Sequence, residues 1–218
     1  MTPLLICSIP RSGKLYFVTT FGKMIKHQFA NIKVCKQEDF AWMLNNQKFG
    51  AFTHYEGLKD LHRKLQIYTD TDKDLRTLIN EVLPGLKIIF IDRRDKVKQA
   101  ISMAQAYETK VYAVFQTDNH EESPEQVTDA EIHKFIHMAA IETTYFENFF
   151  REYEFTPYRL FYENINTTDK LEKVITYLST ELNYKLINPI TIFLKKMSNT
   201  RTEERYNTYL SGNHELWY

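Results

Sequence analysis

A short basic loop near the start of the chain, Ile9-Pro-Arg-Ser-Gly-Lys14, has residue types that bind anions. A strand that turns sharply into a helix leaves backbone N–H groups at the helix start unpaired, and these, with the helix dipole, attract a phosphate. Gly13 would let the backbone approach a ligand closely, Arg11 and Lys14 would add charge, and Ser12 could donate a hydrogen bond. The Walker A spacing is missing. An ordinary turn with exposed basic residues remains the alternative.

A second basic motif follows the apolar run 86–91 and contains Arg93 and Arg94. Ser102 lies eight residues past Arg94, which on a helix is about two turns, or roughly 12 Å. An arginine that reaches forward and a serine hydroxyl on the same side could hold one phosphate between them. A solvated, charged start of a helix is the competing interpretation.

Apolar runs and helical patterns alternate along the chain, which predicts an α/β fold: a mostly parallel central sheet with helices on both faces. Strands are expected at 4–9, 32–35, 86–91 and 157–162. Helical patterns cover 15–26, 40–45, 56–65, 72–82, 97–110, 128–153 and 168–182. Ligands of such sheets bind at the carboxyl ends of the strands, where both basic motifs fall. The length favours a single domain over residues 1–218.

The overall composition excludes several classes of protein. Lys+Arg and Asp+Glu both number 28, so a neutral chain has no global field to hold a nucleic acid. No apolar run approaches the length of about 20 residues needed to cross a bilayer, and the start lacks the features of a signal peptide. Cys7 and Cys35 are expected to be free thiols, and the protein is expected to be cytoplasmic.

The run from Arg93 to Ser102 resembles the 3′-phosphate-binding motif of the sulfotransferase superfamily, in the form found in the bacterial trehalose (glycolipid) sulfotransferase family. The loop at 10–13 resembles the 5′-phosphosulfate loop of that family. Further similar segments follow in the same order, so that the resemblance covers about residues 4 to 182: Gln37-Glu-Asp-Phe40, Phe49-Gly-Ala51 and Tyr158-Arg-Leu-Phe-Tyr-Glu-Asn-Ile165.

The resemblance implies a P-loop-NTPase-like sulfotransferase fold and 3′-phosphoadenosine 5′-phosphosulfate as co-substrate. The 5′-phosphosulfate would be held by the first loop, and Arg93 or Arg94 with Ser102 would hold the 3′-phosphate. Arg201, in a late basic segment, would close over the nucleotide. The nucleotide-binding residues predicted in this way are Arg11, Ser12, Gly13, Lys14, Leu15, Arg93, Arg94, Ser102 and Arg201.

Three residues are predicted to take part in the chemistry. Arg11 would neutralise the leaving phosphate, and Glu38 is the candidate general base that takes the proton of the acceptor hydroxyl. His54 is the alternative base. Glu38 could equally be an exposed surface residue, and a lone histidine is more often structural.

The acceptor implied is a hydroxyl of a carbohydrate, a glycolipid or another small molecule. Aromatic residues at 107–115 and 145–150 could line its site, although aromatics at helical spacing are more often core. The basic tail 195–201 with Arg205 could cover the nucleotide or lie in solvent. No metal is expected, because no His-x-x-x-His pair occurs and the cysteines have no ligand-type neighbours. A homodimer is possible.

The chain departs from the family pattern at three places, and two other functions stay open. Lys14-Leu15 replaces the hydroxyl residues usual after the loop glycine, Phe52 replaces a lysine, and Glu108-Thr-Lys110 lacks the expected Gln-Thr-Gly. The first alternative is a non-catalytic nucleotide-binding or scaffold protein of the same fold. The second is a nucleotide-dependent phosphotransferase, which the missing Walker lysine disfavours, with Asp92 as its one near candidate for a metal ligand.

Overall fold

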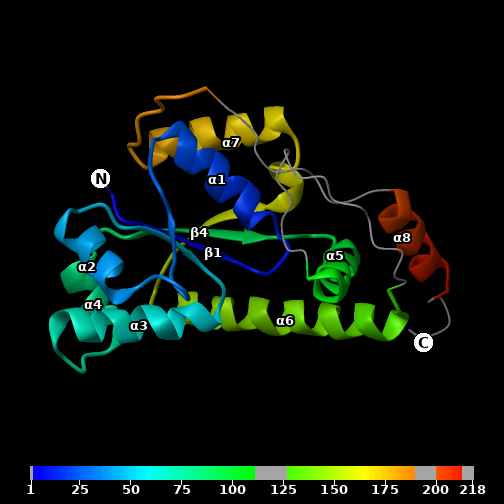
Figure 1. Ribbon diagram of the computed structural model, residues 1–218, viewed down its shortest axis with the longest axis horizontal. Helices are drawn as coiled ribbons and strands as arrows, with labels where there is room; N and C mark the ends of the chain where they lie inside the picture. Colours follow the sequence, from blue (N-terminus) through cyan, green and yellow to red (C-terminus); the bar gives the residue numbers. More distant parts are fainter. Residues whose placement is uncertain (1, 111–126, 190–199, 213–218) are drawn as a thin grey trace.

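A five-stranded parallel sheet forms the centre of the molecule (Figure 1), in the strand order β2-β3-β1-β4-β5. The computed structural model describes residues 2–110, 127–189 and 200–212, without the side chains of Thr200 and Arg201. The strands are β1 (Leu4–Ser8), β2 (Ala30–Asn31), β3 (Gly50–Thr53), β4 (Lys87–Asp92) and β5 (Tyr158–Phe161). The predicted α/β class with a parallel sheet is confirmed.

The central strand β1 is buried along its whole length, as its continuous apolar run predicts. It pairs with β3 on one side and with β4 on the other, with Ser8 opposite Ile91. Because all strands are parallel, the loops that follow β1, β3 and β4 meet at one edge of the sheet. The two basic motifs therefore leave neighbouring strands, as the family resemblance implies.

Helices cover both faces of the sheet (Figure 1). One face carries α1 (Lys14–Met24) and α7 (Thr168–Glu181), whose buried side chains pack with Leu4 and Ile6. The other face carries α2 (Gln37–Asn45), α3 (Glu56–Thr69), α4 (Leu75–Val82) and α6 (Asp129–Glu152), around Leu5 and Phe90. Alternate residues of β1 thus point into two separate cores, which is why the strand reads as apolar throughout.

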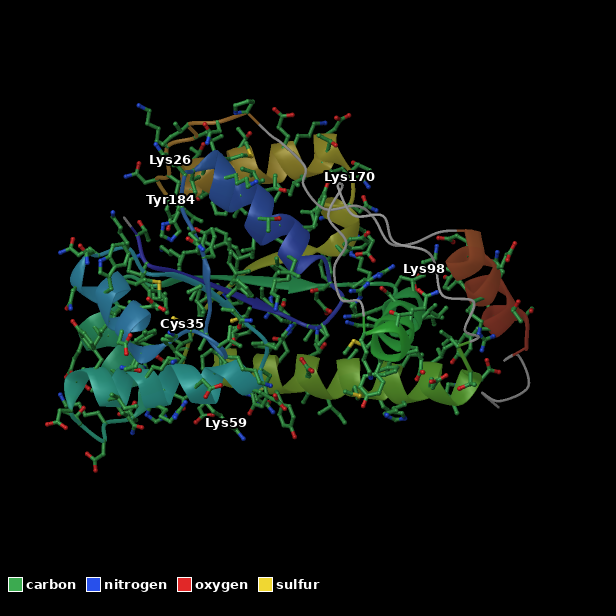
Figure 2. All side chains as sticks on the ribbon, viewed as in Figure 1. Lys26, Cys35, Lys59, Lys98, Lys170 and Tyr184 are labelled. Atoms are coloured by element: carbon green, nitrogen blue, oxygen red, sulfur yellow. The ribbon has the colours of Figure 1, made fainter. Side chains whose placement is uncertain are left out.

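Beyond the carboxyl ends of the strands lies a third, smaller cluster, built by α5 (Lys96–Thr109), α6 and α8 (Thr200–Gly212). Lys98 of α5 lies beside α8 in Figure 2 and donates to Glu203 at 2.7 Å. Arg205 of α8 donates through Nε to the carbonyl oxygen of Val127 at 2.6 Å and pairs with Asp129. The last described helix is thus fixed to α5 and to the start of α6.

The strand predicted at 157–162 is confirmed as β5, whereas β2 and β3 differ from expectation. The prediction of a strand at 32–35 is wrong, since β2 ends at Asn31, whose carbonyl oxygen accepts from the backbone N–H of Cys35 at 2.8 Å. Its side-chain oxygen also accepts from the N–H of Lys33 at 3.2 Å, so the chain turns here. β3 was not predicted, because a four-residue strand of small and mixed residues gives no period-two pattern.

Two further predictions can be compared with the described residues. Cys7 is buried and Cys35 is half-buried, and both are free thiols as predicted. Among the described helices, none has both the length and the apolar character needed to span a bilayer.

Candidate functional site

The loop after β1 is shaped by two residues with left-handed backbone: Arg11 has φ 62° and Gly13 has φ 81°. Gly13 directly precedes α1, and a Cβ built on it would lie 2.6 Å from Cδ2 of Tyr162, so only glycine fits without movement. The N–H groups of the first turn of α1 point out of this loop. The geometry suits an anion at the start of α1.

Ser12 has a different role from the one predicted for its side chain. Its Oγ donates to the carbonyl oxygen of Ile9 at 2.7 Å and to that of Ile91 at 3.0 Å. The hydroxyl proton therefore joins the loop to the end of β4 and is not directed to a ligand. Ser12 was predicted to bind an anion through its hydroxyl and its backbone N–H, and only the backbone N–H remains for that purpose.

Arg11 and Ser102 join the two basic motifs directly. Arg11 Nε donates to Ser102 Oγ at 3.0 Å, across 91 positions of sequence. Nearby, Gln99 Nε2 donates to the carbonyl oxygen of Pro10 at 2.6 Å. Two hydrogen bonds thus join the loop after β1 to the helix after β4.

Arg93 and Arg94 point in different directions. The guanidinium of Arg93 lies 4.7 Å from the ring centre of Tyr162, the residue that contacts Gly13, and its Nε is buried without a hydrogen-bond partner among the described residues. Arg94 is exposed and lies 4.4 Å from the ring centre of Phe161. Arg93 is therefore the arginine turned toward the loop.

The turn after β5 holds the start of α5 in place. The two carboxylate oxygens of Glu163 accept from the backbone N–H groups of Arg94 and Asp95, each at 3.2 Å. Asp92, the candidate metal ligand of the phosphotransferase alternative, accepts from Lys96 Nζ at 2.5 Å and from its neighbouring backbone N–H at 2.7 Å. The carboxylate of Asp92 thus stabilises the turn after β4.

Lys14 and His54 form a buried polar contact at the edge between β1 and β3. Lys14 Nζ lies 2.7 Å from His54 Nε2, and His54 Nδ1 lies 2.8 Å from the carbonyl oxygen of Ser8. Because a carbonyl only accepts, Nδ1 carries the ring proton and Nε2 accepts from the lysine. Burial lowers the pKa of Lys14 to about 8, and burial with the lysine charge lowers the pKa of His54 to about 4. At neutral pH the lysine is charged and the histidine is neutral.

Glu142 of α6 completes this corner, and it was not predicted from the sequence. Burial, reinforced by the charge of Glu56, raises its pKa to about 7, and Lys14 opposes the shift. Its Oε2 is buried and has no hydrogen-bond partner among the described residues. A signal was present in the sequence: Glu142 falls on the apolar stripe of α6, between Ala139 and Phe146.

Glu38 lies away from this corner. It is exposed in the first turn of α2, and its neighbour Gln37 donates to the carbonyl oxygen of Lys64 at 3.1 Å. Lys64 is eight residues beyond Glu56 on α3, about 12 Å along that helix from the end that carries His54. In Figure 1, α2 lies near the N label, away from the arrowhead of β4. The predicted base is therefore not brought to the loop.

The other predicted residues are distributed as follows. Leu15 lies in the first turn of α1 with 36% of its surface exposed. The side chain of Arg201 and the segment 195–199 lie outside the described residues, while Arg205 contacts α6 and not the loop. Of the aromatics at 145–150, three are core residues, Phe146, Phe149 and Phe150, and Tyr145 is half exposed. Residues 111–115 of the other aromatic segment are outside the described part of the chain.

No group of three or more His, Cys, Asp and Glu side chains with metal-site geometry occurs among the described residues. The prediction that the reaction needs no metal stays a prediction.

A parallel α/β sheet with a left-handed loop after its central strand and a basic helix start after the next strand is an arrangement that suits the binding of phosphate groups. The comparison with protein families makes this specific. Residues 39–211 match the model described as Stf0 sulphotransferase, so the chain belongs to this sulfotransferase family. Arg93 and Ser102 lie inside the matched region, and the loop at 10–14 precedes it. A comparison with curated proteins found no match.

Proposed function

We propose that this protein transfers a sulfuryl group from 3′-phosphoadenosine 5′-phosphosulfate to a hydroxyl of a carbohydrate, a glycolipid or another small acceptor. The observation that carries the proposal is the hydrogen bond from Arg11 Nε to Ser102 Oγ. It brings a loop suited to a 5′-phosphosulfate beside a helix start suited to a 3′-phosphate, and both phosphates of one adenosine nucleotide could then be bound together.

The residues present fit such a nucleotide. Gly13 adopts the left-handed backbone that starts α1, and Arg93 has a buried Nε without a partner among the described residues. A buried guanidinium N–H without a partner is costly, and a phosphate oxygen would satisfy it. We assign the 5′ side to Arg11, Lys14 and the N–H groups of residues 12–15, and the 3′ side to Arg93 and Ser102. The region 195–201 remains a predicted cover.

The chemistry follows from charge placement. Sulfuryl transfer needs in-line geometry and stabilisation of the charge that develops on the leaving oxygen. Arg11 and Lys14 would face that charge, and a preformed donor of this kind is typically worth about 10²–10³ in kcat. Lys14 is held for this task by the neutral His54, which accepts one of its N–H groups. His54 in this role positions the lysine.

The test is thermal unfolding with 3′-phosphoadenosine 5′-phosphate in the absence of magnesium. Ligand at a hundred times its Kd should add about 2.7 kcal/mol, which is roughly 5–10 °C in Tm for a chain of this size. Arg11→Ala should abolish the shift, whereas Arg63→Ala, an exposed arginine of α3, should keep it. Stabilisation by ATP with magnesium alone would favour the phosphotransferase. Binding without transfer to any hydroxyl would favour a non-catalytic protein.

A further inference from the structure

The position of Glu142 follows from the packing of α6 on the sheet. Phe146, one turn further along the helix and on the same face, is fully buried with its ring centre 5.2 Å from that of Phe90 in β4. α6 runs antiparallel to β4 (Figure 1), since it leads back to the parallel strand β5. Glu142 is one helical turn before Phe146, so it lies closer to the carboxyl ends of the strands. This places Glu142 beneath the end of β1.

A pair of aromatic rings ties this turn of α6 to the segment after β3. Tyr55, which follows His54, stacks on Tyr145 with ring centres 4.4 Å apart and an interplanar angle of 13°. It also contacts the ring of Phe146 edge-on at 6.0 Å. The segment that carries His54 and the turn of α6 that carries Glu142 are thus packed together, and both side chains interact with Lys14.

We propose that Glu142 is the catalytic base, the group that takes the proton of the acceptor hydroxyl, an inference that rests on the proposed sulfotransferase function. In this step the acceptor oxygen forms a bond to sulfur, and the bond from sulfur to the 5′-phosphate oxygen breaks. The hydroxyl proton moves to a carboxylate oxygen of Glu142 and later leaves to solvent. Donor and acceptor thus become 3′-phosphoadenosine 5′-phosphate and a sulfate ester.

Two neighbouring groups are less suited to this role. The Nε2 lone pair of His54 already accepts from Lys14, and its pKa near 4 makes it a weak base. Glu56 is exposed and pairs with Lys33 at 2.6 Å. Oε2 of Glu142 is the buried acceptor oxygen of this cluster that has no partner among the described residues.

The charges around Glu142 favour a base that works near neutral pH. Burial and the negative charge of Glu56 from α3 raise its pKa, the positive charge of Lys14 from α1 lowers it, and His54, from the segment after β3, is neutral. With a pKa of about 7, about half of the carboxyl is ionised at pH 7, which suits a general base.

The first experiment needs no acceptor. The binding of 3′-phosphoadenosine 5′-phosphate is measured by calorimetry at pH 7 in two buffers of different ionisation enthalpy, which gives the protons taken up. A phosphate beside Lys14 offsets the lysine charge and raises the pKa of Glu142, so the wild type should take up as much as about half a proton more than Glu142→Gln. Lys14, with its pKa of about 8, is already about nine-tenths protonated at pH 7 and adds little.

Glu147→Gln is the matched control, because Glu147 lies on the same helix but pairs with the exposed Arg159. Its proton uptake should equal that of the wild type. Equal uptake by the wild type and Glu142→Gln would overturn the inference while leaving nucleotide binding, and so the proposed function, intact. A wild type that does not bind the nucleotide would overturn both.

The second experiment measures transfer of labelled sulfate to trehalose and to p-nitrophenyl glucoside. Glu142→Gln should lower kcat by about 10²-fold or more with nucleotide affinity retained. The wild-type rate should rise with pH through about 7, and Glu56→Gln should move that rise to lower pH, because it removes a charge that raises the pKa of Glu142. Glu142→Gln with full turnover, or a rise that Glu56→Gln leaves in place, would refute the assignment.

Discussion

Arg11 and Ser102 are hydrogen-bonded to each other across 91 positions of sequence, Arg11 in the loop after β1 and Ser102 about two turns into α5, the helix after the neighbouring strand β4. Both groups can donate a hydrogen bond to a phosphate oxygen, and each lies on a segment that follows a buried parallel strand. The strands β1 and β4 that carry the two motifs lie side by side, so one ligand could reach both.

Ser102→Ala should weaken the binding of 3′-phosphoadenosine 5′-phosphate by about 10–100-fold, since a hydrogen bond to a charged group contributes about 1.5–3 kcal/mol. Titration calorimetry gives the change in Kd. The control is Ser211→Ala at the exposed end of α8, where the hydroxyl donates to a carbonyl of its own helix. Equal affinities in the two variants would exclude Ser102 from the site.

Gly13→Ala should lower both stability and nucleotide affinity. The backbone there has φ 81°, and the added methyl would meet Tyr162 at 2.6 Å, so either the ring or the loop must move. Gly85→Ala is the matched control, because Gly85 also has positive φ, 74°, but no atom lies within 4 Å of its Cβ position.

The control variant should lose about 1–2 kcal/mol of unfolding free energy from the left-handed backbone alone. Gly13→Ala should lose more, and it alone should weaken the nucleotide. Urea unfolding with and without 3′-phosphoadenosine 5′-phosphate measures both effects. Identical losses of unfolding free energy in the two variants would show that the Tyr162 ring moves aside without cost.

Nucleotide affinity should fall as the pH rises above about 8. Burial lowers the pKa of Lys14 to about 8, so its charge is present below that pH and is lost above it. An anion beside the ammonium favours the charged form, so the fall begins near the pKa of the free protein, continues up to the higher pKa of the complex, and is at most about tenfold per pH unit. Lys14→Arg keeps its charge at every accessible pH and should flatten the profile. A profile that falls equally in both proteins would assign the titration to another group.

Much of the fold was predictable because the buried parallel strands have continuous apolar runs. The segments at 4–9 and 86–91 identify β1 and β4, and the alternation with helices gives the parallel sheet. The short strands β2 and β3 were harder to predict. β2 is two residues long and ends at the Asn31 turn, so it depends on its pairing with β3 more than on a local pattern.

Arg11, Gly13 and Ser102 could be found from the sequence since their roles depend on short spacings that follow a strand. A role for Glu142 could not be predicted from a short spacing, because the proposed role depends on the tertiary contact of α6 with the end of β1. Glu38 shows that the position of an acidic residue in the sequence does not by itself place it at the site. Its helix α2 packs along the far part of α3.

His54 and Lys14 give the last prediction, which separates a positioning role from a base. Glutamine offers an oxygen that can accept the Lys14 N–H group, whereas leucine does not, and neither can take a proton at neutral pH. If His54 positions the lysine, His54→Gln should keep most of the turnover. His54→Leu should lose about 10–100-fold, the range expected for a hydrogen bond to a charged group.

The pH dependence of nucleotide affinity is a second measurement, and a purely structural defect would not change it. Without its acceptor the ammonium is less stabilised, so the fall in nucleotide affinity should begin at lower pH in His54→Leu than in His54→Gln. Were His54 the base, both variants would lose turnover alike, and Glu142→Gln would retain it. The pair of substitutions at 54, measured beside Glu142→Gln with the same nucleotide and acceptors, therefore decides which side chain removes the proton.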